Sequence, residues 1–118
     1  QAQALPLFAP LPHDLPLANL CREFLCQPSI HTLPEAWARQ LHCSQRTFNR
    51  LFRQQTGLSF GVWRQQACLM AAIPRLLSGN SVTRTALELG YDSPAAFSSM
   101  FRKVLGQSPS TFVRAANR

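Results

Sequence analysis

The chain has 118 residues, 46% of them hydrophobic, which allows one small domain, or two very small ones, around a packed core. Twelve Lys and Arg residues outnumber five Asp and Glu, the formal net charge is +7, and all but one of the basic residues are Arg. No apolar run reaches the roughly 18 residues that a membrane helix needs, so we expect no membrane partner. Because the guanidinium fork suits phosphates and guanine edges, the charge balance favours a nucleic-acid partner, with a merely basic surface as the alternative.

The sequence contains no pattern typical of a catalytic or metal site. The four cysteines include no C-x-x-C pair, and the histidines have no Cys or carboxylate at ligand spacing, so we expect free thiols, no metal and no cofactor. The acidic residues are dispersed, and no Ser-His-Asp set, Cys-His set or Gly-rich phosphate loop is evident, which argues against an enzyme. The first residue is Gln rather than Met, and we therefore expect a fragment of a longer polypeptide.

The N-terminal segment is predicted to be an extended linker. Three prolines within residues 1–13 disfavour both a helix and a central strand. Its apolar side chains, Leu5 and Phe8 among them, are expected to pack on the domain or on a missing neighbour. Asp14 is a suitable N-cap for a first helix that ends by Pro28. The apolar residues of this helix recur at the spacing of one buried face and are Leu17, Leu20, Cys21, Phe24 and Leu25.

A capping box is predicted at the start of the second helix. In this motif the side chains of Thr32 and Glu35 would each accept a hydrogen bond from the other residue's backbone N–H. We therefore expect a helix over about residues 33–40, with Leu33 among its inward side chains and Trp37 in the core.

Two strongly patterned helices follow. Ser44 is the expected N-cap of a helix over about residues 45–55, whose apolar face comprises Phe48, Leu51 and Phe52. The opposite face of this helix carries Gln45, Arg46, Asn49, Arg50 and Arg53. After a stop at Gly57, a long helix is expected over about residues 60–77. Pro74 lies inside it and is expected to kink or break it, because proline lacks an N–H and clashes with the preceding turn.

The stretch from Ser81 to Phe112 has the pattern of a helix-turn-helix motif. Ser81 is a suitable N-cap, Gly90 ends the first helix, and Ser93 followed by proline begins a second helix. The buried face of the second helix is predicted to comprise Phe97, Met100, Phe101 and either Val104 or Leu105. Two helices joined by a short glycine-containing turn, in a basic chain, are typical of this DNA-binding motif.

The chain repeats itself at an offset of 49 residues. The matched pairs are Ser44 and Ser93, Phe48 and Phe97, Phe52 and Phe101, Arg53 and Arg102, Gly57 and Gly106, Ser59 and Ser108, and Trp63 and Phe112. We therefore predict a Pro-rich linker over residues 1–13, one helix-turn-helix subdomain over 14–58, a linker helix over 59–78 and a second subdomain over 79–118. The turn of the second subdomain is expected to be about one residue longer than that of the first.

These residues resemble a known family. The second subdomain carries the run Ala86-Leu87-Glu88-Leu89-Gly90-Tyr91-Asp92-Ser93-Pro94, then Phe97, Phe101-Arg102, Gly106 and Ser108-Pro109. The first adds Ser44, Phe48, Leu51-Phe52, Gly57-Leu58-Ser59 and Trp63-Arg64-Gln65-Gln66. Over about residues 14–114 the chain resembles the DNA-binding domain of the AraC/XylS family of bacterial transcription regulators. One departure is Cys68, where the family often has Arg, so a phosphate contact or surface ion pair is expected to be missing there.

The resemblance implies an all-α, homeodomain-like domain of about seven helices. It implies that the third and sixth helices enter successive major grooves of double-stranded DNA at an asymmetric operator. It also implies a larger bacterial regulator, an activator or a repressor, with an effector-binding or dimerising N-terminal domain that this chain lacks. Such a regulator is expected in the cytoplasm, bound to the nucleoid, with RNA polymerase as a further candidate partner.

The outward faces of the two recognition helices are the candidate DNA contacts. In the first unit the predicted base-reading residues are Arg46, Asn49 and Arg50, with Gln45 beside them. The alternative is a solvated Arg face. In the second unit the predicted base contacts are weaker and come from Ala95, Ala96 and Ser99. The predicted phosphate contacts are Ser44, Arg53, Ser93, Ser98, Arg102 and Lys103. We therefore expect strong sequence preference in one half-site and weak preference in the other.

The main rival is a helical protein–protein interaction module with a basic surface, because such bundles also expose amphipathic faces. The Arg-rich face and the 49-residue repeat argue against that interpretation. Double-stranded RNA is disfavoured as a partner, since its deep, narrow major groove excludes a reading helix.

Overall fold

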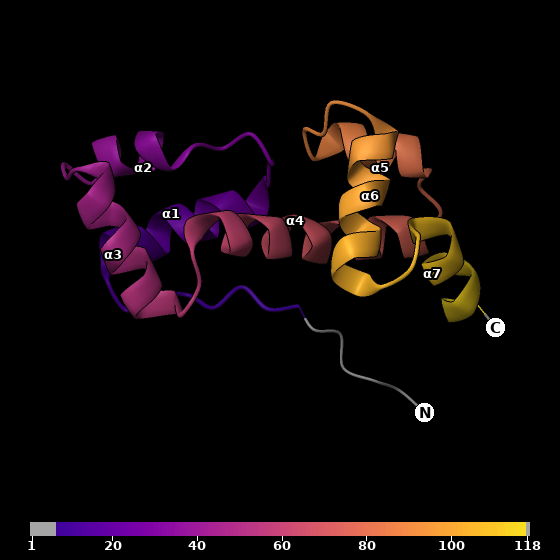
Figure 1. Ribbon diagram of the computed structural model, residues 1–118, viewed down its shortest axis with the longest axis horizontal. Coiled ribbons are helices and arrows are strands. Elements are labelled where there is room, and N and C mark those ends of the chain that lie inside the picture. Colours follow the sequence, from indigo (N-terminus) through magenta and orange to yellow (C-terminus); the bar gives the residue numbers. More distant parts are fainter. Residues whose placement is uncertain (1–6, 118) are drawn as a thin grey trace.

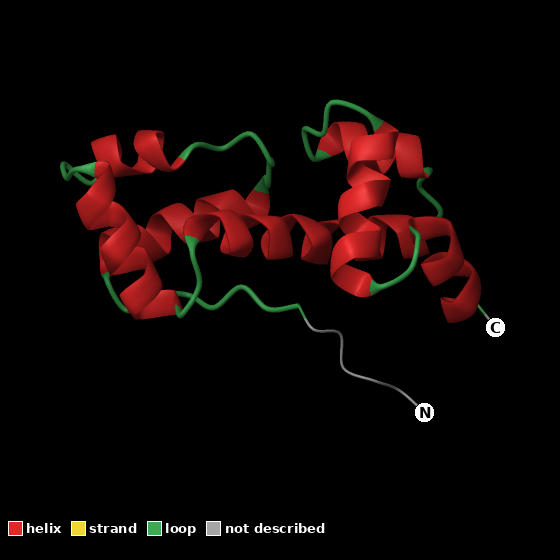
Figure 2. Ribbon diagram, in the orientation of Figure 1, coloured by secondary structure: helices red, strands yellow, loops and turns green. Residues whose placement is uncertain are grey.

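The computed structural model describes residues 7–117, and this part of the chain contains seven α-helices and no strand (Figure 1, Figure 2). The helices are α1 Leu15–Cys26, α2 Pro34–Gln40, α3 Gln45–Thr56, α4 Phe60–Leu77, α5 Val82–Glu88, α6 Pro94–Leu105 and α7 Pro109–Ala116. They form two groups at the two ends of α4, with α1–α3 at one end and α5–α7 at the other (Figure 1). The predicted all-α class and the number of helices are confirmed.

Side-chain caps define where six of the seven helices begin. At each of these starts an oxygen of the N-cap side chain accepts a hydrogen bond from a backbone N–H in the first turn, and the caps are Asp14, Ser44, Ser59, Ser81, Ser93 and Ser108. Gly57 and Gly106 end α3 and α6 in the left-handed conformation, with φ of 77° and 81°. The sequence therefore places these helix ends correctly.

The start of α2 differs from the prediction. Its N-cap is Leu33, which makes no side-chain cap hydrogen bond, and Leu33 is 56% exposed rather than turned inward. Because the N-cap is Leu33, Thr32 and Glu35 each lie one residue before the N-cap and N3 positions that a capping box needs. The carbonyl of Thr32 instead accepts a hydrogen bond of 2.6 Å from Nη1 of Arg64, a contact from α4 that the local sequence does not reveal. The predicted capping box is therefore wrong.

An aromatic core stabilises the first group of helices. Six rings meet there, in mostly edge-to-face pairs, and they belong to Phe24, Trp37, Phe48, Phe52, Phe60 and Trp63. Trp63 is fully buried and Trp37 is 5% exposed, which confirms that both indoles belong to the core. This cluster of six rings holds α3 against α2 and α4, and so determines which face of α3 is exposed.

A second core forms around the other half of α4. Leu69, Ala72, Ile73 and Leu76 pack there with Ala86, Leu89, Tyr91, Phe97 and Phe101. The long helix thus contributes its first half to one core and its second half to the other. It continues without a break through Pro74, so the predicted break is wrong. Pro74 is exposed and lies three residues before the end of α4, where the missing N–H removes a hydrogen bond from the last turns only.

The end of the predicted linker packs on the domain. Nε1 of Trp63 donates a hydrogen bond of 3.0 Å to the Pro10 carbonyl, and the Phe8 N–H donates one of 3.2 Å to Oε1 of Gln66. Residues 1–6 of the linker, which include Leu5, lie outside the described residues. Among the helices that the structure describes, none has the length and apolarity needed to cross a bilayer.

Candidate nucleic-acid interface

Helices α2 and α3 form the first helix-turn-helix unit, and α5 and α6 form the second. The two turns begin in the same way. The Cys43 N–H donates a hydrogen bond to the Ala38 carbonyl in the first, and the Tyr91 N–H donates one to the Ala86 carbonyl in the second. His42 has φ 57° where Gly90 has φ 84°, so the first turn holds a non-glycine residue in the left-handed region. The second turn has one extra residue before its N-cap serine, which confirms the predicted difference in length.

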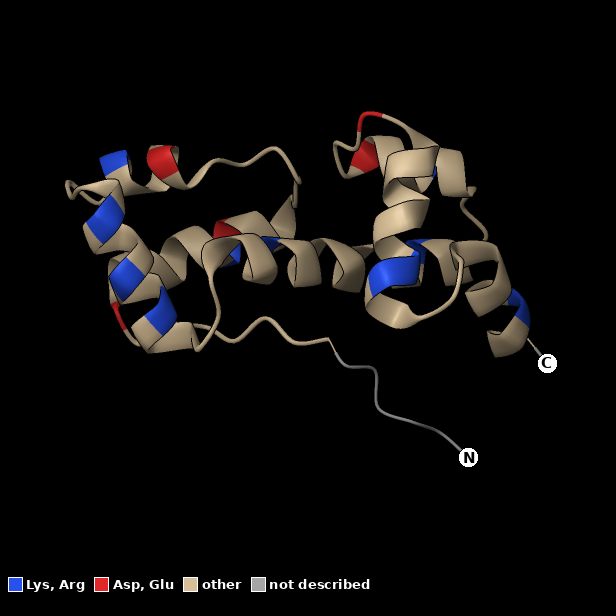
Figure 3. Ribbon diagram, in the orientation of Figure 1, with Lys and Arg blue, Asp and Glu red and all other residues tan. Residues whose placement is uncertain are grey.

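The exposed face of α3 is polar and basic. Phe48 and Phe52 are fully buried, so the opposite side of the helix must face solvent. The predicted base-reading set lies there, and all of its members are exposed: Gln45, Arg46, Asn49 and Arg50, with Arg53 next to them. Helix α3 contains no Asp or Glu, and Figure 3 shows basic positions along its length. The arrangement brings three guanidinium groups to one acid-free helix face.

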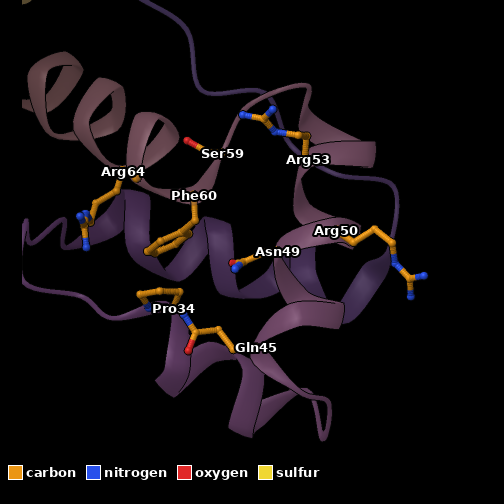
Figure 4. A pocket seen from close by; sticks show the side chains of 9 residues that line it. Pro34, Gln45, Asn49, Arg50, Arg53, Ser59, Phe60 and Arg64 are labelled. Carbon is orange, nitrogen blue, oxygen red and sulfur yellow. The ribbon is translucent and has the colours of Figure 1, made fainter.

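A hollow of about 510 Å³ lies between this face and the start of α4. It is lined by Pro34, Gln45, Asn49, Arg50, Arg53, Ser59, Phe60, Gly61 and Arg64. In Figure 4 the ring of Phe60 lies near the centre, the Asn49 side chain points toward it, and the Arg50 guanidinium points away into solvent. Arg50 is thus free to reach beyond the helix, whereas Asn49 lies deeper.

Arg64 is the residue of this region to which the sequence alone assigned no role. Its guanidinium carbon lies 5.5 Å from the Phe60 ring centroid, and its Nη1 donates to the Thr32 carbonyl. The spacing of four residues between Phe60 and Arg64 on one helix is the sequence signal that could have predicted their contact. Arg64 connects the start of α2 to α4 at the edge of the hollow.

The exposed face of α6 is short and weakly polar. Ala95, Ala96 and Ser99 are exposed, whereas Ser98 is half-buried. Phe97 and Phe101 are fully buried on the other side of the helix. Ala95, Ser98 and Ser99 therefore present methyl and hydroxyl groups where α3 has Arg46, Asn49 and Arg50.

Apart from Ser98, which lies inside α6, the predicted phosphate contacts lie at the ends of the two recognition helices. Ser44 and Ser93 are the N-caps of α3 and α6, and each hydroxyl oxygen accepts a backbone N–H. The Ser44 hydroxyl also donates to Oγ1 of Thr47 at 3.0 Å, so part of its capacity is used within the protein. Arg53, Arg102 and Lys103 are exposed in the last turns of the helices.

Two arginines outside α3, one on α4 and one on α5, are paired with a carboxylate. Glu88 accepts contacts from Nε of Arg75 at 3.3 Å and from Nε of Arg84 at 3.2 Å, which tie α5 to α4 and to its own first turn. The other contact of a basic side chain with a carboxylate in the described part of the chain joins Nε2 of His31 to Oδ1 of Asp92 at 3.2 Å. The guanidinium groups on α3 take part in none of these contacts, so they are available to an external anion, as are Arg102 and Lys103 at the end of α6.

The buried thiols have a structural role. Cys21 and Cys68 are fully buried in the first core, and burial raises the pKa of each to about 12. Both thiols therefore stay protonated near neutral pH, a state unsuited to nucleophilic attack. Within residues 7–117 no group of three or more His, Cys, Asp or Glu is placed to hold a metal ion. The Cys68 side chain faces the core, and it takes part in no surface ion pair of the described residues.

Two units of this geometry, held on one long helix, define the class of double helix-turn-helix DNA-binding domains. A family model described as a helix-turn-helix domain matches residues 37–115, and the chain belongs to this family, in its AraC-type branch. The resemblance stated from the sequence is thereby confirmed.

Relatives and solved structures agree with this assignment. The transcriptional regulator NimR of Escherichia coli K12 is 46% identical over 77 residues, which are 65% of this chain and 28% of NimR. The regulator RipA of Corynebacterium glutamicum is 30% identical over 105 residues, which are 87% of this chain and 31% of RipA. The chain thus spans less than a third of the length of either regulator.

One solved structure includes nucleic acid. The DNA-binding domain of the global transcriptional factor AdpA, crystallised in complex with a target DNA, is 32% identical to this chain. The superposition has a TM-score of 0.79 and covers 87% of this chain and 96% of the other.

Proposed function

We propose that this chain is the sequence-specific, double-stranded DNA-binding domain of a bacterial transcription regulator, with α3 and α6 in two successive major grooves. The observation that carries the proposal is the outward face of α3, which presents three Arg side chains and no acid above a rigid aromatic core. A helix of this kind fits the width of the major groove, and its exposed side chains reach base edges.

The first half-site is read by α3. Arg46 and Arg50 are exposed and unpaired with acid, and each can donate two hydrogen bonds to O6 and N7 of a guanine. Asn49 can pair with N6 and N7 of an adenine, and Gln45 lies at the first position of the helix to contact the neighbouring base. Each bidentate pair contributes about 1–3 kcal/mol of discrimination against the wrong base.

The second half-site is contacted by α6 with little base discrimination. Ala95 and Ala96 can touch thymine methyl groups, and Ser99 can make one hydrogen bond. The phosphate contacts fix the domain on the duplex without sequence preference. They are assigned to Ser44, Arg53, Ser93, Ser98, Arg102 and Lys103. In the proposed operator, the half-site bound by α3 therefore has a strong sequence preference and the half-site bound by α6 a weak one.

The wider organisation is part of the proposal. Residues 14–58 and 79–118 act as the two DNA-binding subdomains, and residues 59–78 connect them. The greater length of NimR and RipA supports the proposal that effector binding or dimerisation involves sequence outside this chain, and RNA polymerase is a further candidate partner. Such a regulator works in the cytoplasm at the nucleoid and has no catalytic role. A protein-interaction module is less consistent with the acid-free Arg face, which would need an acidic partner surface.

The proposal is tested by binding to duplex DNA across a salt series, followed by selection of bound sequences from a random pool. We expect the logarithm of the binding constant to fall linearly with the logarithm of the salt concentration, with a slope of about −0.9 per phosphate contacted. We also expect the selection to enrich one motif. Double-stranded RNA of matched length is the control and should not yield an enriched motif. A domain that ignores DNA at low salt would contradict the proposal.

A further inference from the structure

The two helix-turn-helix units touch each other away from α4. The loop between α1 and α2 meets the turn between α5 and α6, where the Ile30 N–H donates a hydrogen bond of 2.9 Å to the Leu89 carbonyl. Beside it, Nε2 of His31 lies 3.2 Å from Oδ1 of Asp92. We name this contact, between residues 29–31 and residues 89–92, the inter-unit latch.

The latch depends on the absence of a side chain at Gly90. A Cβ built there would lie 2.8 Å from Oγ of Ser29, 3.4 Å from Cδ2 of His31 and 3.7 Å from the Ile30 nitrogen. A side chain at position 90 would therefore displace the Ser29 hydroxyl and crowd the His31 ring. The other left-handed glycines differ, since Gly57 and Gly106 have nothing within 4 Å of the same position. Left-handed backbone alone thus explains those two glycines, and close approach is an additional requirement at Gly90.

Ile30 also joins the two cores. Its half-buried side chain packs against both the aromatic cluster of the first unit and the cluster that surrounds Phe97 and Phe101. The backbone hydrogen bond and the side-chain packing at Ile30 thus act at one point. This point and α4 are two separate connections between the units.

We propose that the inter-unit latch fixes the orientation of α6 relative to α3 and thereby sets the spacing between the two half-sites. The inference rests on the proposed function. A single connecting helix leaves the units able to hinge about it, whereas a second attachment away from its axis resists that motion. The contact positions the two helices and does not itself bind DNA, because none of its residues lies on the outward face of α3 or α6.

A fixed orientation matters most for the weaker unit. Once α3 is bound, α6 engages its groove as an intramolecular event, whose strength depends on how often α6 is held at the correct place. A hinge would spread α6 over many positions and lower that effective concentration. The latch therefore makes weak base contacts on α6 useful to a two-groove complex.

The test compares Gly90→Asn with Gly106→Asn. Asn tolerates the left-handed backbone, and φ is 84° at Gly90 and 81° at Gly106, so the two substitutions carry similar strain. Only the side chain at position 90 meets the loop. Two readouts are used: hydrogen exchange of the Ile30 amide in the free domain, and affinity for two duplexes, one with the whole selected site and one with only its α3 half.

We expect Gly90→Asn to speed exchange of the Ile30 amide and to weaken binding to the whole site by about tenfold, while affinity for the half-site duplex stays at the wild-type value. Its hydroxyl-radical footprint should lose or shift the block protected by the second unit. Gly106→Asn should leave the exchange rate and the footprint unchanged.

Several outcomes would overturn the latch. One is unchanged Ile30 exchange in Gly90→Asn; another is faster exchange together with wild-type affinity and footprint on the whole site. If Gly90→Asn loses half-site binding, it has failed to fold, and Ile30→Ala decides by the same two readouts, with a smaller effect of the same sign expected. If the wild-type domain binds no duplex, the proposed DNA function fails and the positioning role with it, while Ile30 exchange still reports the contact itself.

Discussion

The two helix-turn-helix units have the same backbone arrangement but differ in their core side chains and in their exposed side chains. Both have an N-cap serine, two fully buried Phe residues and a stop glycine at matched positions of the recognition helix. The first core has six aromatic rings, whereas the second has four, from Tyr91, Phe97, Phe101 and Phe112. At matched positions, Arg46, Asn49 and Arg50 of the first unit correspond to Ala95, the half-buried Ser98 and Ser99 of the second.

This difference indicates a division of work. Buried positions are constrained by the frame, so they repeat, while exposed positions are free to differ. Bidentate reading of a base edge needs a long or forked polar side chain, which α3 has and α6 lacks. The rigid ring cluster under α3 is the support that such reading requires, because a base contact is only as selective as the helix is fixed.

The largest expected effect is on the two cores. Trp63→Ala should lower the free energy of unfolding by about 3–5 kcal/mol, because the fully buried indole contacts several rings and donates to the Pro10 carbonyl. The matched change Phe112→Ala should cost less, since Phe112 is only half-buried. Denaturant unfolding of both variants measures the difference. Equal losses would show that the two cores carry the domain equally.

The second prediction concerns base reading. Arg50→Ala should lose about 1–3 kcal/mol of binding free energy at one base pair, and the preference at that pair should relax while others are kept. The matched change Ser99→Ala should have little effect on any pair. Competition binding over all single-base variants of the selected site measures both. A uniform loss in Arg50→Ala would instead assign Arg50 to phosphate.

A third, smaller effect is expected at the phosphate positions. Arg102→Ala and its repeat partner Arg53→Ala should weaken binding to all sequences alike and reduce the salt slope by about one each. Affinities at four or more salt concentrations give the slope. A change in sequence preference in either variant would mean that the residue reads a base.

The smallest expected effect lies in the turns. His42 has φ 57° where the second unit has glycine, so His42→Gly should raise the free energy of unfolding by up to about 1 kcal/mol. The gain is limited because glycine also increases the entropy of the unfolded chain. Thermal unfolding measures it, with DNA affinity expected to be unchanged. A loss of stability would mean that the His42 side chain makes a contact that outweighs the backbone strain.

The helix ends were predictable because their signals are local. An N-cap serine or a left-handed glycine acts within one turn of the helix. The helical spacing of the apolar residues identifies which face of α3 and of α6 is exposed. The exposure of the candidate residues followed from this pattern, while their contacts with DNA remain predictions.

The features that sequence reasoning missed depend on contacts between distant segments. Arg64 of α4 binds the Thr32 carbonyl just before α2, a contact between residues 32 positions apart. The approach of Ile30 to Leu89 brings together residues far apart in the chain and has no local signal.

The central claim is that α3 reads sequence and α6 mainly holds the domain on DNA. The most direct test is the affinity of the wild-type domain for its selected site with every base pair of both half-sites replaced in turn. We predict large losses at several pairs under α3 and small, nearly uniform losses under α6. Equal losses in the two half-sites would contradict the claim.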